Sequence, residues 1–222
     1  GWWRKSSPAA PRVGQRATRD ATSSIDLSQL APPAADLLAH ACATTLILAE
    51  DCARVAKEAW SVVDQDALAR SASALFQRYE KLRALLADYS DDPMQALVAP
   101  LDYQREQFAR MTSEYWIERV TTIHVAGGFL DDVYSIVSQG LPQPARSDIS
   151  LLVSSGVESE LIAQVIQRIC ATDAAHQSRL SLWSRRLVGD VMLISRRALQ
   201  SDEGERLGGS AYEPVFTDVI TE

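Results

Sequence analysis

The chain has 222 residues and a mass of 24.4 kDa, and 46% of its residues are hydrophobic, which suits one domain with a sizeable core. Its formal charge of −7 argues against a general nucleic-acid binder, which needs a broad positive surface. No stretch reaches the ~18 consecutive apolar residues of a membrane span, so we expect no membrane insertion and a cytoplasmic location.

Residues 1–25 differ in composition from the rest of the chain, because they have no apolar period and are basic. Their charged residues are Arg4, Lys5, Arg12, Arg16, Arg19 and Asp20. Such a segment is typical of a flexible arm. We expect a solvated tail, with contact to RNA or to an acidic partner as the alternative.

From residue 26 onward, apolar residues recur with the period of an α-helix. The pattern predicts helices over residues 34–61, 65–88, 94–110, 113–137, 147–171 and 174–200. The fifth should be interrupted near residues 154–156. Long apolar helices joined by short turns predict an all-α antiparallel bundle over residues 26–200, followed by a polar tail over residues 201–222.

Local signals predict the ends and faces of these helices. Asp64 is the expected N-cap of the second helix and Pro93 the expected first residue of the third, which Pro100 should kink or divide. The apolar stripe of the second helix places Phe76 toward the core.

Gly127 and Gly128 fall in the middle of the fourth predicted helix. Two interior glycines cost about 2 kcal/mol of helix stability relative to alanine. We therefore expect close helix packing, a local bulge or a ligand near the backbone at this point.

A helical bundle can hold two iron ions when Glu-x-x-His motifs place a carboxylate and an imidazole on one helix face. Asp173-Ala-Ala-His176 comes nearest, but Asp173 is the expected N-cap of the last helix. His40 and His124 are expected at the surface or hydrogen-bonded in the core. The cysteines, Cys42, Cys52 and Cys170, have no metal-binding spacing and are expected to be free thiols.

Residues 179–190 read RLSLWSRRLVGD and resemble the R-L-x-L-W-x-R-R-L-V-G-E/D stretch of bacterial ferritin-like proteins similar to MiaE, the tRNA 2-methylthio-N6-isopentenyladenosine hydroxylase. Shorter matches occur in the same order, at residues 48–51 (LAED), 79–83 (YEKLR), 116–118 (WIE) and 132–134 (DVY). The resemblance covers about residues 35–195. It implies a ferritin-like four-helix bundle with additional helices, and a di-iron centre.

The chain departs from the family at the positions of the metal ligands. By this alignment the first ligand Glu falls near Ala41, the Glu-x-x-His falls on residues 75–78, the Asp of the family's G-D-G falls on Gly127, and the late His falls near Val157. Arg78 would place a fixed positive charge where a cation should sit. We therefore expect no cofactor, and we hypothesise that a buried Glu118 pairs with Arg78.

Together these features predict a MiaE-like protein that has lost its di-iron site and acts as a structural or interaction module, in a homo- or hetero-oligomer with a ferritin-like relative. The alternative is an active di-iron tRNA hydroxylase, whose candidate metal ligands are Glu50, Glu80, Glu118 and His176. A third reading, a ligand-binding regulator with a cavity around the two glycines, rests on those glycines alone.

Other charged residues have simpler interpretations. Arg186 is expected to form a salt bridge with Asp190, four residues on. Contact of Arg185 and Arg186 with tRNA phosphates is the weaker alternative. Glu158 and Glu160 are expected to be first-turn charges favoured by the helix dipole.

Overall fold

A computed structural model describes residues 31–154 and 156–199. The predicted basic arm and polar tail lie outside the described residues. Within them the chain forms helices and no strand. The helices are α2 (Ala34–Lys57), α3 (Val62–Leu86), α4 (Pro93–Arg110), α5 (Trp116–Ser138), α6 (Ala145–Val153), α7 (Val157–Thr172) and α8 (Ala174–Leu199).

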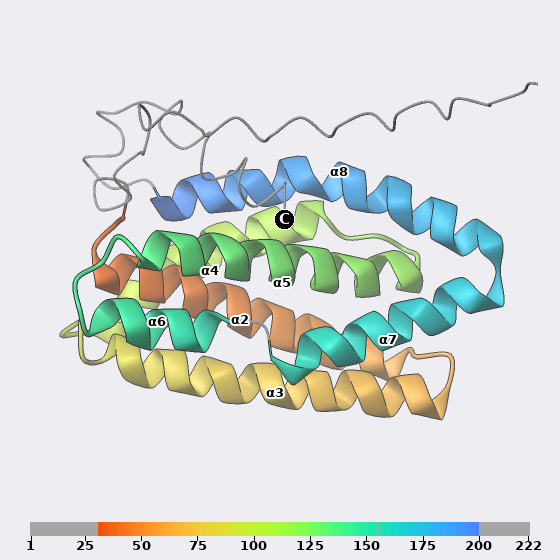
Figure 1. Cartoon of the computed structure of the whole chain (residues 1–222), viewed down its shortest axis with the longest axis horizontal. Coiled ribbons are helices and arrows are strands. Elements are labelled where there is room, and N and C mark those ends of the chain that lie inside the picture. The colour runs from red at the N-terminus through yellow and green to blue at the C-terminus, as the bar shows by residue number, and fades with distance from the viewer. Residues whose placement is uncertain (1–30, 155, 200–222) are drawn as a thin grey trace, which may run out of the picture.

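Helices that follow one another in the chain run in opposite directions along one axis, with α6 and α7 forming one leg (Figure 1). α2 packs against α3 and α5, while α6 and α7 follow one another end to end and contact both α3 and α5. α4 and α8 cover α2 and α5 from the other side. The predicted all-α bundle with additional helices is confirmed.

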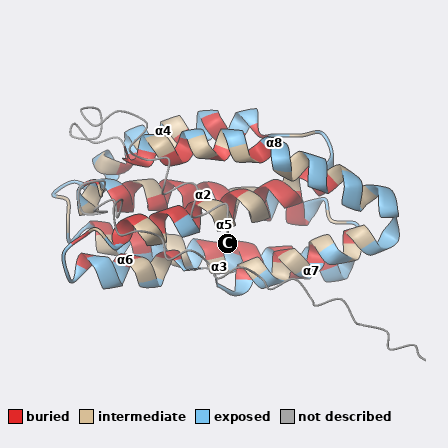
Figure 2. Cartoon of the chain, turned by 45° about the horizontal axis from the view of Figure 1, so that its top comes forward, coloured by how far each residue is buried: buried red, intermediate tan, exposed pale blue. Residues whose placement is uncertain are grey.

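The core lies between these helices, and α2 and α5 contribute most to it. Figure 2 shows buried residues concentrated on these two helices, with exposed residues on the outer faces of the others. Leu37, Leu38, Leu130 and Val133 are fully buried. Burial on this scale supplies the hydrophobic free energy that holds the bundle together.

The prediction that Phe76 faces the core is wrong. Phe76 is 38% exposed, because it lies at the edge of the apolar stripe of α3, and Leu182 is 66% exposed on the face of α8 opposite its buried residues. Next to Leu182, Trp183 is half-buried and donates a hydrogen bond from Nε1 to Thr122 Oγ1 at 2.8 Å.

Three helix starts show which residues cap the helices. The Ser61 hydroxyl, and not the predicted Asp64, caps α3 by accepting a hydrogen bond from the Asp64 amide. Asp64 lies in the first turn of the helix and pairs with Arg168 of α7 at 2.6 Å. α4 begins at Pro93, as predicted, behind an Asp92 cap. Asp173 accepts a hydrogen bond from the Ala175 amide, which confirms it as the cap of α8.

Pro100 does not divide α4, which continues through it to Arg110. The predicted interruption of the fifth helix is confirmed by the gap between α6 and α7.

By length and composition alone, the stretch Ala145–Thr172 that contains this gap is long and apolar enough to cross a membrane, which is weak evidence for insertion.

Candidate functional site

A buried ion cluster lies at the middle of the bundle, where α3, α5 and α7 meet beside α2. Arg78 of α3 donates from Nη1 to Asp131 Oδ2 of α5 at 2.8 Å, and its Nη2 pairs with the Glu158 carboxylate of α7. The three side chains are 10%, 12% and 9% exposed. We call this group the Arg78 cluster.

Close packing of α2 against α5 leaves little room beside the cluster. A Cβ at Gly127 would lie 3.1 Å from Leu48 Cδ1 of α2, whereas one at Gly128 would meet nothing within 4 Å. The expectation of close helix packing at the two glycines is therefore confirmed for Gly127. The remaining void is about 20 Å³, enough for about one water.

The backbone of Gly156, at the start of α7, holds Glu158 in the cluster. The Glu158 carboxylate accepts a hydrogen bond from the Gly156 amide at 3.0 Å. A Cβ at Gly156 would lie 2.5 Å from Glu158 Oε2, so the missing side chain makes the approach possible. The first-turn position of Glu158 was predicted, but its burial and its pairing with Arg78 were not.

The cluster has two carboxylates and one guanidinium, so it carries excess negative charge when both acids are ionised. Burial raises the pKa of Asp131 to about 6, and the neighbouring Arg78 opposes this rise. A proton held on Asp131 would bring the cluster to neutrality. His124, which lines the same void, has a pKa that burial lowers, so it adds no positive charge at neutral pH.

These residues do not fit a di-metal centre. Such a centre needs carboxylate and imidazole ligands from all four surrounding helices, but α2 presents Leu48 here, and α3 presents Leu75 and Arg78. A guanidinium stays protonated and has no lone pair for a metal. Nowhere in residues 31–154 and 156–199 do three or more His, Cys, Asp or Glu side chains gather in a metal-binding group.

The four candidate metal ligands lie in other environments. Glu50 forms a bidentate pair with Arg105 at the surface, and Glu80 is exposed on α3. The His176 ring lies 5.7 Å from the Trp60 ring between centroids, at a tilt of 50°, and its Nδ1 lies 3.1 Å from the Ile169 carbonyl oxygen.

The hypothesis that Glu118 pairs with Arg78 is wrong. Glu118 is buried, as expected, but it accepts hydrogen bonds from Arg179 Nε of α8 at 2.7 Å and from the Ser113 hydroxyl. It precedes Asp131 by 13 residues on α5, which is about 20 Å along the helix. Glu118 and Asp131 therefore lie far apart along the bundle and pair with different arginines.

The predicted Arg186–Asp190 pair is also absent from the described residues. Arg186 is exposed, and its guanidinium lies 5.4 Å from the Trp183 ring. A cation over an indole face is a weak attraction at an exposed site. Arg185 is exposed on the same helix.

A second polar cluster joins α2 to α4 and α5. Thr44 Oγ1 lies 2.7 Å from both Gln104 Oε1 and the Tyr134 hydroxyl. Gln104 Nε2 donates to the His40 carbonyl oxygen at 3.1 Å and approaches His40 Nδ1 at 3.4 Å. Burial lowers the pKa of His40 to about 4, so this histidine is a neutral, hydrogen-bonded part of the core.

The cysteines are free thiols, as predicted. Cys42 and Cys52 are buried on α2, and burial raises the pKa of each to about 12. A thiol with so high a pKa is a poor nucleophile at neutral pH, so neither is a candidate catalytic residue.

Comparison with known proteins agrees with this architecture. Residues 29–207 match a family model described as "Ferritin-like domain, actinomycetes". No curated protein matches the sequence. This match covers most of the chain and agrees with its helical bundle. The chain therefore belongs to the ferritin-like domain family of actinomycetes.

Proposed function

We propose that this ferritin-like protein is a MiaE-like relative that has exchanged its di-metal centre for the Arg78 cluster, and that it acts as a structural or interaction module. One observation carries the proposal. The Arg78 guanidinium lies between the Asp131 and Glu158 carboxylates in the space enclosed by α2, α3, α5 and α7.

Electrostatics explains why this arrangement opposes metal binding. A divalent cation 4 Å from a guanidinium is repelled by about 8 kcal/mol at an effective dielectric constant of 20. Binding would also require Asp131 and Glu158 to exchange Arg78 for the metal, which leaves a buried charge unpaired. The same cluster supplies internally the positive charge that a metal would otherwise provide.

The alternative, an active di-iron tRNA hydroxylase, needs Glu50, Glu80, Glu118 and His176 to converge. Glu50 and Glu118 are committed to arginines of α4 and α8, and Glu80 faces outward. These contacts favour the metal-free proposal.

Metal content after reconstitution tests the proposal. The purified chain is incubated with excess Fe(II) without oxygen, desalted and analysed for iron. We expect well below one iron per chain, both for the wild type and for Arg70→Ala, which removes an exposed arginine from α3. Two irons per wild-type chain would contradict the proposal.

The interaction role has its own test. We expect sedimentation velocity to show a dimer or larger assembly of the chain alone, or a complex with a metal-bearing ferritin-like relative. A monomer at every concentration, with no complex, would exclude this role. We expect no retarded tRNA band at about 200 mM salt, where weak phosphate contacts fade.

A further inference from the structure

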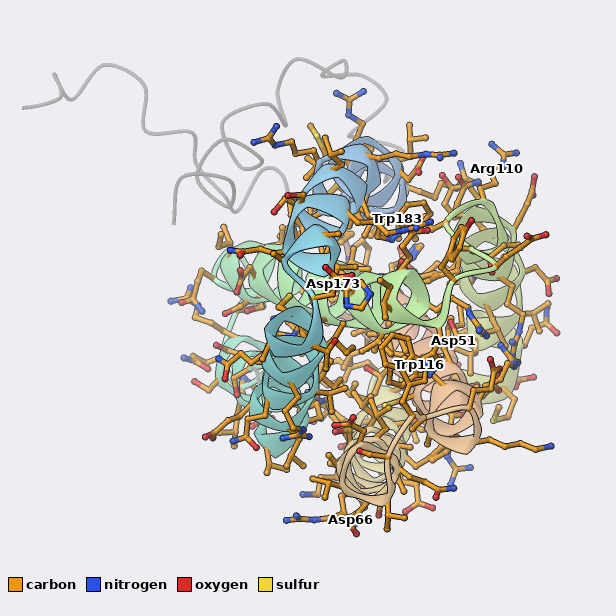
Figure 3. The ribbon with its side chains drawn as sticks, turned by 90° about the vertical axis from the view of Figure 1, so that its right-hand side faces the viewer. Asp51, Asp66, Arg110, Trp116, Asp173 and Trp183 are labelled. Carbon is orange, nitrogen blue, oxygen red and sulfur yellow. The ribbon has the colours of Figure 1, made fainter. Side chains whose placement is uncertain are left out.

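A second cavity opens between α2, α4 and α5. Its volume is about 270 Å³, the space of about nine waters at ~30 Å³ each. Asp51 of α2 lies on its lining, and Figure 3 places that residue near the α4 and α5 ribbons. We call it the α2/α4/α5 cavity.

One side of this cavity is apolar. The hydrophobic lining residues come from α2, from α4 and the residue after it, and from α5; they are Ile47, Val55, Phe108, Ala109, Met111 and Ile123. Most of them are buried members of the core. Such a wall suits a short hydrocarbon chain or an aromatic ring.

The other side is rich in guanidinium groups. Arg54, Arg105 and Arg119 line the cavity, with Asp51 as the lining carboxylate. Burial raises the pKa of Asp51, and the neighbouring Arg54 opposes this. Each of these arginines is paired with a carboxylate: Arg54 with Asp51 at 2.7 Å, Arg105 with Glu50, and Arg119 with Glu58.

The arginines keep donors available despite their ion pairs. Arg105 binds Glu50 through Nη1 and Nη2, at 2.8 and 3.1 Å, and Arg119 binds Glu58 in the same way. Neither glutamate lines the cavity. A guanidinium has five N–H donors, so each can serve a carboxylate outside the cavity and a ligand within it.

Arg119 supplies the most specific observation. Its Nε is buried and has no hydrogen-bond partner among the described residues. Buried donors in native proteins nearly always have an acceptor. Arg119 lines the cavity, so a small movement of its side chain toward a ligand there would give this donor an acceptor.

We propose that the α2/α4/α5 cavity binds a small amphipathic carboxylate, with its head on Arg119 and Arg105 and its apolar body against Phe108 and Ile123. The remaining guanidinium donors favour a carboxylate acceptor, and the apolar wall favours a hydrocarbon body over a bare inorganic ion. The site is separate from the Arg78 cluster and does not depend on the proposed function.

Calorimetry on the full chain at pH 7 tests the proposal, with octanoate below its micelle concentration as the probe. We expect one saturable site per chain. 1-Octanol, which lacks the charge, and inorganic phosphate, which lacks the body, should each bind at least tenfold more weakly. No octanoate binding, or equal affinity for octanol, would overturn the proposal.

Variants locate the site. Arg119→Gln should weaken octanoate binding at least tenfold, while Arg110→Gln, an exposed arginine of α4 outside the lining, should change it less than twofold. Because Arg119 also pairs with Glu58, Ala109→Leu provides a second test that fills the cavity without changing its charge. Octanoate binding that survives both Arg119→Gln and Ala109→Leu would contradict the assignment.

Discussion

At the scale of single residues, Arg78 determines the chemistry of the bundle centre. Its guanidinium joins acids from two other helices in a place that is about nine-tenths buried. A buried ion pair adds little stability over a well-packed apolar group, but removing one partner leaves an unpaired buried charge. Without Arg78, the buried carboxylates of Asp131 and Glu158 would have no cationic partner in the cluster.

Arg78→Ala should lower the free energy of unfolding by about 3–5 kcal/mol, because Asp131 and Glu158 would lose their common partner. Urea denaturation measures this difference. Arg70→Ala is the matched control, since Arg70 is 62% exposed and 3.8 Å from Asp66, and it should cost less than about 1 kcal/mol. Equal effects of the two substitutions would mean that the cluster has no special role.

Asp131 should make stability depend on pH. Its pKa of about 6 lies above the ordinary value of 3.8, so the folded protein holds a proton that the unfolded chain releases at lower pH. Stability should fall by about 2 kcal/mol between pH 4.5 and 7 from this group. Asp131→Asn, which cannot ionise, should lack this part of the pH dependence when both proteins are unfolded with urea. An unchanged pH dependence in the variant would refute the assignment.

The sequence predicts part of this cluster. Arg78 is recognisable because it falls at a ligand position of the resembling family. Its partners are not, because pairing depends on the level at which each acid lies along its helix. The sequence offers Glu118 as the partner of Arg78, yet Glu118 lies on another level of α5 and binds Arg179.

At the scale of helices, α2 and α5 approach closely at Gly127. The absence of a side chain there lets Leu48 of α2 contact the α5 backbone. Periodicity predicts the helices and most of their ends to within a few residues. It does not predict that α4 continues through Pro100 or that Ser61 caps α3, because these depend on local geometry.

Gly127 and Gly128 should respond oppositely to larger side chains. Gly127→Leu should destabilise the fold by about 1–3 kcal/mol, because overpacking must displace Leu48. Gly128→Ala should stabilise it by up to about 1 kcal/mol through helix propensity, because its Cβ meets nothing within 4 Å. Thermal unfolding of the two variants checks this. Destabilisation by Gly128→Ala, or tolerance of leucine at 127, would contradict the packing described.

At the scale of the whole molecule, the ferritin-like bundle could be predicted from helical periodicity and the resemblance around Trp183. The α2/α4/α5 cavity could not, since its lining combines residues from Ile47 to Ile123 that become neighbours only when the helices pack. The fold creates two chemically different sites, the Arg78 cluster and the α2/α4/α5 cavity. The centre is filled by internal charge pairs, and the cavity beside it keeps arginine donors available.

Anomalous diffraction at the iron absorption edge, from crystals grown with excess Fe(II), tests the central claim most directly. The account predicts no anomalous peak among Arg78, Asp131 and Glu158, with the guanidinium density between the two carboxylates. Two peaks about 3.5–4 Å apart at this position, the spacing of two-metal sites, with Arg78 turned away, would contradict it.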